Sequence, residues 1–183
     1  MSFFSKIFGR RDPLPRIVAH TAFDGAVRVI EAPTEDGWDH AEDARRGDGF
    51  TAMVLRYVRI APPEPLALLA KIYTLEPTRD LPEDPRATDW RAAFGPLFAT
   101  IESVEVRDAT QLTMKRALPA IEALVNGIGT DHGTPLRIRE RRSVAAREQL
   151  IVTAMGSPRA FQELGPTIDR WFETSAFAPL ADG

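Results

Sequence analysis

Apolar and polar residues alternate along much of this chain, which is the pattern of β-strands with one buried face. Six segments with this pattern are expected as strands: residues 16–20, 26–32, 50–60, 101–106, 136–142 and 149–154. The segment 50–60 has apolar residues on both of its faces, which predicts a strand covered on both sides. The continuous run Leu150-Ile151-Val152 predicts a second strand of that kind.

One further segment, Pro119 to Gly129, is ambiguous between strand and helix. Its apolar residues fit helical spacing, whereas Gly127 and Gly129 weaken a helix and the segments that follow pair as strands. We predict a strand here. Turns at Asp24-Gly25, at residues 130–133 and at 143–147 would then join successive strands as hairpins.

Helical spacing predicts three helices. The first follows three prolines and begins near Pro65, because proline is tolerated in a first helical turn. The second is expected over 89–99, capped by Thr88. The apolar residues of these two helices recur every three or four positions: Leu66, Leu69, Ile72 and Tyr73 in the first, and Trp90, Phe94, Leu97 and Phe98 in the second.

The third predicted helix has the clearest start signal. Ser157 can cap it and Pro158 stands at its first position. Gly165-Pro166 interrupts its apolar stripe, so we expect a kink or a restart there. The stretch 39–49 is polar and acidic and ends in a Gly-Asp-Gly turn, with no strand or helix assigned to it. Residues 76–87 are predicted to form a surface loop, and the tail from Thr174 is predicted to be irregular.

Length and composition indicate an ordinary globular protein. The chain has 183 residues, of which 44% are hydrophobic and 27% charged, which fits one domain with a real core. We expect an N-terminal extension over 1–15, a single domain over 16–175 and a tail over 176–183. A net charge of −3 argues against a dedicated nucleic-acid binder. The lack of cysteine excludes disulfides and thiolate metal sites.

No apolar run reaches the length of about 20 residues that a membrane-spanning helix needs, and the first residues lack the order of a secretory signal. These observations predict a cytoplasmic protein. Four apolar residues near the start recur at helical spacing and could anchor the chain to a membrane surface: Phe3, Phe4, Ile7 and Phe8. The alternative is a terminal turn packed on the domain, or a disordered end.

The last quarter of the chain is similar to the C-terminal half of the PsbP-like superfamily. The strand Val152-Thr153-Ala154 precedes a helix with the spacing of that group, and Gly37-Trp38 matches its early "P-x-G-W" pattern. The helix residues that carry the likeness are Phe161, Leu164, Pro166 and Ile168. The group includes Mog-type nuclear import factors and Eag-type secretion chaperones.

This resemblance implies an α+β fold, in which an antiparallel sheet has helices on both faces as an α/β/α sandwich. It also implies a non-enzymatic adaptor, chaperone or assembly factor. It supplies no site residues, because the group has no common site motif.

Motifs for catalysis are missing from the sequence. The chain has neither a glycine-rich phosphate loop nor a GxSxG nucleophile elbow. Its three histidines, His20, His40 and His132, are far apart and fit solvated loop positions better than a metal or acid–base site. We therefore expect no enzyme activity, no metal and no cofactor, with a polar pocket at His40 or His132 as the feature that would favour an enzyme or small-ligand binder instead.

The feature nearest to a binding site is a row of three arginines, Arg137, Arg139 and Arg141. Strand periodicity places all three on one face, where they could bind an acidic partner or an anion. Alternatively, they pair with acids such as Glu105 or Glu122, or lie on a solvated face. We predict a protein that binds a partner, acidic or with an apolar segment, through a sheet face or edge. A role in a secretion or assembly system is the narrower version.

Overall fold

The computed structural model describes residues 18–23, 26–60, 64–112, 117–131 and 133–179. The strands are β1 (Val18–Phe23), β2 (Ala26–Ile30), β3 (Trp38–Gly47), β4 (Phe50–Arg59), β5 (Leu66–Leu75), β6 (Phe98–Asp108), β7 (Gln111–Leu112), β8 (Ala117–Leu118), β9 (Ala120–Gly129), β10 (Pro135–Ala145), β11 (Glu148–Gly156) and β12 (Ala176–Pro179). The helices are α1 (Trp90–Phe94), α2 (Pro158–Glu163) and α3 (Gly165–Thr174).

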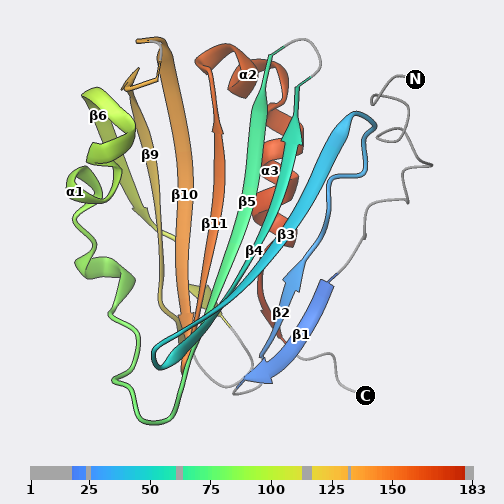
Figure 1. Cartoon of the computed structure of the whole chain (residues 1–183), viewed down its shortest axis with the longest axis vertical. Helices are drawn as coiled ribbons and strands as arrows, with labels where there is room; N and C mark the ends of the chain where they lie inside the picture. Colours follow the sequence, from blue (N-terminus) through green and yellow to red (C-terminus); the bar gives the residue numbers. More distant parts are fainter. Residues whose placement is uncertain (1–17, 24–25, 61–63, 113–116, 132, 180–183) are drawn as a thin grey trace, which may run out of the picture.

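Seven strands form one antiparallel sheet in the order β3-β4-β5-β11-β10-β9-β6 (Figure 1). Within it, β3, β4 and β5 form one meander, and β9, β10 and β11 form another. The two meanders meet where β5 pairs with β11, with Thr74 opposite Glu148 and Leu66 opposite Gly156. The free edges of this sheet are β3 and β6 in the part of the chain that the structure describes. A smaller sheet has the order β1-β2-β12, and β7 pairs with β8.

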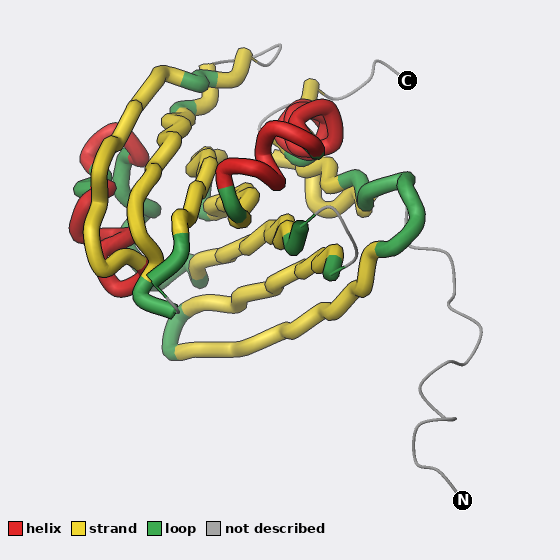
Figure 2. The backbone as a smooth tube through the Cα atoms, turned by 90° about the horizontal axis from the view of Figure 1, so that it is seen from above, coloured by secondary structure: helices red, strands yellow, loops and turns green. Residues whose placement is uncertain are grey.

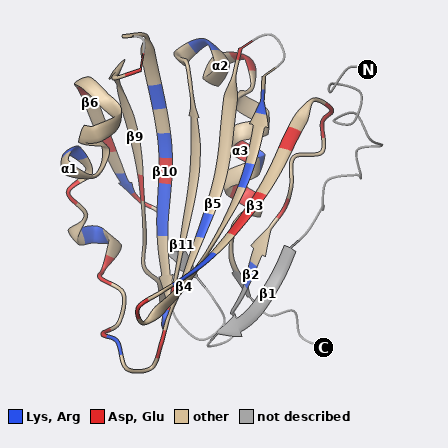
Figure 3. Cartoon of the chain, in the orientation of Figure 1, with Lys and Arg blue, Asp and Glu red and all other residues tan. Residues whose placement is uncertain are grey.

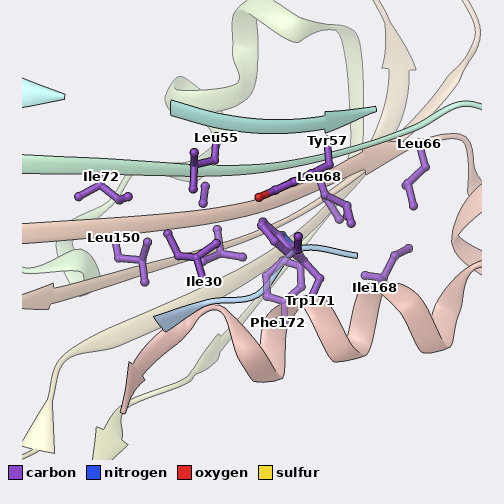
Figure 4. Close-up of a cluster of buried hydrophobic side chains, with 14 of the residues drawn as sticks. Ile30, Leu55, Tyr57, Leu66, Leu68, Ile72, Leu150, Ile168, Trp171 and Phe172 are labelled. Carbon is purple, nitrogen blue, oxygen red and sulfur yellow. The ribbon is translucent and has the colours of Figure 1, made fainter. Parts of the chain in front are cut away.

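The large sheet curls around the helix pair α2–α3, which lies on its concave face, whereas α1 lies outside the curl (Figure 2). Alternate residues of the central strands point into the space between sheet and helices, which is the period-2 pattern of a strand with one face in the core. This concave core includes Leu55, Tyr57, Leu68, Leu150, Val152, Ile168, Trp171 and Phe172 (Figure 4).

A second, smaller apolar cluster lies on the convex face of the sheet. Asp89 begins α1 by accepting a hydrogen bond from the Ala92 amide at 3.1 Å, as an N-cap carboxylate does. The residues of this cluster come from α1 and from β6, β9 and β10: Trp90, Phe94, Phe98, Ile121, Ala123, Val125 and Ile138. The five residues of α1 therefore cover one end of the convex face.

The expected α/β/α sandwich with helices on both faces was wrong. The protein is mainly β, with one seven-stranded antiparallel sheet, small additional sheets and only three short helices among its described residues. The main reason is the segment 66–75, which we expected as a covering helix and which is β5, an interior strand of the large sheet.

The misassignment of β5 has a physical explanation. Its sequence, LALLAKIYTL, has apolar residues at nearly every position, so helical and strand spacing fit equally well. In the structure Leu66, Leu68, Ala70 and Ile72 are buried in period 2, because β4 and β11 pair with the segment on either side. Tertiary pairing thus overrides the local pattern.

Other expectations have mixed outcomes. The polar, acidic stretch 39–49 was not predicted as a strand, but most of it forms β3, and the tail expected to be irregular after Thr174 contains β12. The predicted strand at 119–129 is confirmed as β9. The last helix begins at Pro158 with Ser157 as its cap and restarts at Gly165, as predicted. The expected extension 1–15 lies outside the described residues, as does the turn at Asp24-Gly25.

Candidate functional site

The row Arg137, Arg139 and Arg141 lies along β10 on the concave face of the sheet, beneath the helices α2 and α3. Figure 3 shows several basic residues along this strand, with an acidic residue among them. The predicted common face is confirmed by the contacts of the three guanidinium groups, which all lie near an aromatic ring of the helix pair. Their burial differs, however, and so do their partners.

Arg141 is part of the fold rather than of the surface. It is 9% exposed, and its Nη2 donates hydrogen bonds to the backbone carbonyls of Phe172 at 2.6 Å and Ser175 at 2.5 Å. These carbonyls lie at the C-terminal end of α3, where a cation is favourable to the helix dipole. Burial lowers the pKa of Arg141 to about 10, so the side chain remains charged at neutral pH.

Arg139 is the centre of an ion-pair network. Its Nε donates to Glu122 Oε1 at 2.8 Å and its Nη1 to Asp169 Oδ1 at 2.6 Å. The guanidinium also lies 4.1 Å from the centroid of the Phe172 ring, which is a cation–π distance. Glu122 accepts a second hydrogen bond from Arg107 of β6. This buried carboxylate therefore joins three strands and leaves Arg139 with its charge compensated.

Arg137 differs from the other two arginines. Its Nε donates to the neutral side chain of Asn126 at 2.5 Å, and its guanidinium lies 5.8 Å from the centroid of the Phe161 ring on α2. Within the described part of the chain, no carboxylate lies within ion-pair distance of Arg137. The contacts with Asn126 and Phe161 fix the position of its positive charge. Because the side chain is half-buried, solvent can still reach it.

Arg137 and Arg139 line a cavity of about 430 Å³ that opens beside β6, which we call the arginine groove. Arginines and acids share its polar part, while Leu124 and Phe161 give it an apolar part. The full lining is Glu105, Val106, Arg107, Glu122, Leu124, Arg137, Arg139, Phe161 and Asp169. Such a mixture of forked donors and apolar surface suits a carboxylate on an apolar stem.

The alternative anticipated from the sequence, that neighbouring acids pair with the arginines, holds for Glu122 but not for Glu105. Strand periodicity could also have indicated Arg107, since it shares a face with Glu105. Phe161, Phe172 and Asp169 come from the helices. No sequence signal brings them to β10, because their position depends on how the helix pair packs on the sheet.

A second, larger groove lies at one end of the sheet strands, and the β3–β4 hairpin turn lies at the other end. It has a volume of about 850 Å³ and is bordered by the start of β5, the β9–β10 hairpin and the N-terminus of α2. Its lining is largely apolar and includes Val58, Leu66, Ala67, Leu97, Leu136 and Met155. We call it the apolar groove.

The histidines do not form a site in the described part of the protein. His40 is exposed and stacks on Tyr57 with a ring-centroid distance of 5.1 Å. His132 and the side chain of His20 lie outside the described residues. No group of three His, Asp or Glu residues that could hold a metal ion occurs among those that are described. In the same residues, no helix is long and apolar enough to cross a membrane.

Comparisons with known proteins give distant structural similarities to solved structures. No family model matches the sequence, and no curated protein matches it significantly. The fold is similar to that of PA94, a protein of unknown function from Pseudomonas aeruginosa, with a TM-score of 0.41 and 9% sequence identity. The similarity covers 88% of this chain and 96% of PA94. At this distance it assigns neither a family nor a function.

Proposed function

We propose that this protein is a non-enzymatic interaction protein that binds a segment of another protein in the arginine groove. The observation that carries the proposal is Arg137, whose charge is held in place by Asn126 and Phe161 and has no carboxylate partner among the described residues. A preorganised, partly desolvated guanidinium binds a carboxylate more strongly than a freely moving surface cation does.

The chemistry of the groove indicates the kind of segment. An Asp or Glu side chain of the bound segment would accept hydrogen bonds from Arg137. The methylene groups of that side chain, or an apolar residue next to it in the segment, would contact Leu124 and Phe161. Arg139 is less available, because Glu122 and Asp169 already occupy its donors. Arg141 is buried and would act only by holding α3 above the groove.

The proposal is tested by charge reversal of the half-buried Arg137. Arg137→Glu should remove binding of the partner proteins that the wild-type chain captures, while its thermal unfolding stays close to wild type. Arg159→Glu is the matched control for the arginine groove, because Arg159 lies on α2, is exposed, pairs with Glu163 within its own helix and lines the apolar groove instead. Quantitative mass spectrometry of captured proteins gives the comparison.

Proteins that are lost with Arg137→Glu and retained with Arg159→Glu would support the proposal. If both variants capture the same proteins as wild type, the arginine groove is not the binding site. Stabilisation of the wild-type chain by small carboxylates, abolished in Arg137→Glu, would instead favour a small-ligand-binding protein.

A narrower version is a chaperone of a secretion or assembly system, and the apolar groove favours it. An apolar segment of a client protein would find there a concave surface lined by Leu97, Leu136 and Met155. Leu97 is 42% exposed although it is a large apolar residue. Co-expression with an apolar client segment should yield a complex that Met155→Glu disrupts. A chain that binds no such segment would contradict this version.

A further inference from the structure

The outer edge of β6 is the free sheet edge that adjoins the arginine groove. Its first half is irregular, because the register with β9 shifts between Phe98 and Thr100 and again between Ile101 and Ser103. From Ser103 to Asp108 the register is regular. We call this segment the β6 edge. Bulges protect a sheet edge against pairing, so the β6 edge is the part left open to another strand.

The side chains of the β6 edge alternate between the two faces of the sheet. Glu105 and Arg107 lie on the concave face and line the arginine groove. Val104 contributes to the convex cluster, and Val106, on the same face, is 52% exposed. In the described part of the chain, no hydrogen bond or ion pair joins the Glu105 carboxylate to another residue.

The central part of this segment, Glu105-Val106-Arg107, is complementary to itself when it is read antiparallel about Val106, whereas Val104 lies opposite Asp108. In that register Glu105 lies opposite Arg107 of a second copy, and Arg107 lies opposite its Glu105. Val106 meets its own counterpart on the other face. Directly opposite residues of an antiparallel pair lie within about 5.5 Å at their Cβ atoms, so both ion pairs can form.

Neighbouring registers lack this complementarity. Centring the pair on Glu105 brings two carboxylates opposite each other, and centring it on Arg107 brings two guanidinium groups together. Like charges directly opposite in a sheet are destabilising. We infer that the protein forms a two-fold symmetric dimer through the β6 edge, centred on Val106, so that the two seven-stranded sheets continue into one.

The dimer completes the arginine groove and also accounts for an exposed apolar residue. Glu105 of the second copy would lie beside Arg107, at the open side of the groove. The exposed Val106 would be covered by its counterpart. A self-complementary strand is the requirement of an isologous two-fold interface, in which each pair of contacts occurs twice. This inference is independent of what the groove binds.

Charge reversal and restoration test the interface in the full-length chain. The wild type should sediment as a dimer that dissociates on dilution. Glu105→Arg or Arg107→Glu should raise the dissociation constant about tenfold or more, because two attractive pairs become repulsive. The double variant with both changes should return to dimer. Asp43→Arg on the opposite edge strand, β3, serves as control and should leave the dimer unchanged.

Cross-linking gives a second readout that does not depend on charge. The natural chain has no cysteine, so Val106→Cys introduces one thiol per copy, with its partner directly opposite across the two-fold axis. Under mild oxidation it should form disulfide-linked dimers much faster than Leu81→Cys, which lies at a position that is 64% exposed. A wild type that stays monomeric at every concentration, a dimer that charge reversal leaves intact, or equal cross-linking of the two cysteine variants would each overturn the inference.

Discussion

The guanidinium of Arg141 donates to the backbone carbonyl of Phe172 at 2.6 Å, and it lies 5.6 Å from the centroid of the same residue's ring. One side chain of the sheet thus holds both the backbone and the side chain of α3. The helix pair is short, and this contact fixes its C-terminal end on β10. Loss of the contact should therefore weaken the packing of α3 on the concave core and lower the stability of the fold.

Arg141→Met should lower the free energy of unfolding by about 2–4 kcal/mol, because two buried carbonyls lose their donor. Urea denaturation measures the change. The control is Arg170→Met, since Arg170 is exposed and its ion pair with Glu31 at 2.9 Å should contribute less than about 1 kcal/mol. Equal losses of unfolding free energy in the two variants would show that the hydrogen bonds of Arg141 stabilise the fold no more than a surface ion pair does.

Arg28 and Glu148 form a buried ion pair between the small sheet and the large one. Glu148 also accepts a hydrogen bond from Thr74 at 3.1 Å. Arg28→Met should lower the free energy of unfolding by about 3–5 kcal/mol, because it leaves a buried carboxylate without its cation. The double variant Arg28→Met with Glu148→Leu should recover much of this loss, since it removes both charges.

The pH dependence of the single variant follows from the same pair. Burial raises the pKa of Glu148 above its ordinary value of 4.5, and Arg28 opposes this rise. Without Arg28 the folded chain should hold the proton more tightly than the unfolded chain does. The stability of Arg28→Met should be highest below pH 4.5 and should fall as pH rises through the folded-state pKa. The double variant should lack this fall.

Tyr57 offers a test at alkaline pH. It is fully buried, and its hydroxyl has no hydrogen-bond partner among the described residues. Burial raises its pKa from 10.0 to about 12. The unfolded chain therefore ionises first, and the wild type should lose up to about 3 kcal/mol of stability as pH rises from 10 to 12. Tyr57→Phe should lose less over that range and should be at least as stable at pH 7.

Gly127 of β9 lies against the irregular part of β6. A Cβ atom at this position would lie 2.1 Å from the backbone oxygen of Thr100. Gly127→Ala should therefore lower the free energy of unfolding by about 1–3 kcal/mol, because backbone must move. At Gly165, which begins α3, a Cβ would meet nothing within 4 Å. Gly165→Ala should be neutral or stabilising, and thermal unfolding of the two variants gives the comparison.

How far the sequence predicts this fold depends on the origin of each signal. Local signals succeeded, as at Ser157-Pro158 and Gly165-Pro166, where capping and the lack of an amide hydrogen act within one turn. The prediction failed at β3 and β5, which form strands because neighbouring strands pair with them. The strand β3 has nine polar, small or charged residues after Trp38, so nothing in its own pattern shows that β4 will pair with it.

The candidate site shows the same division. Period 2 correctly places Arg137, Arg139 and Arg141 on one face, because that follows from strand geometry alone. It does not show that Arg141 is buried under α3 or that Glu122 compensates Arg139. Those facts depend on helices and strands that are distant in sequence. Whether Arg137 has a carboxylate partner likewise depends on where every neighbouring acid lies in the folded chain.

The junction between β5 and β11 also has a consequence for how this chain folds. Each meander is built from hairpins whose strands are close in sequence, so each can form by local contacts. The junction instead joins Thr74 to Glu148, which are 74 residues apart. Closing such a long loop has a large entropic barrier, and proteins dominated by distant contacts fold slowly. We expect the two half-sheets to form first and the joining of β5 to β11 to set the rate of folding.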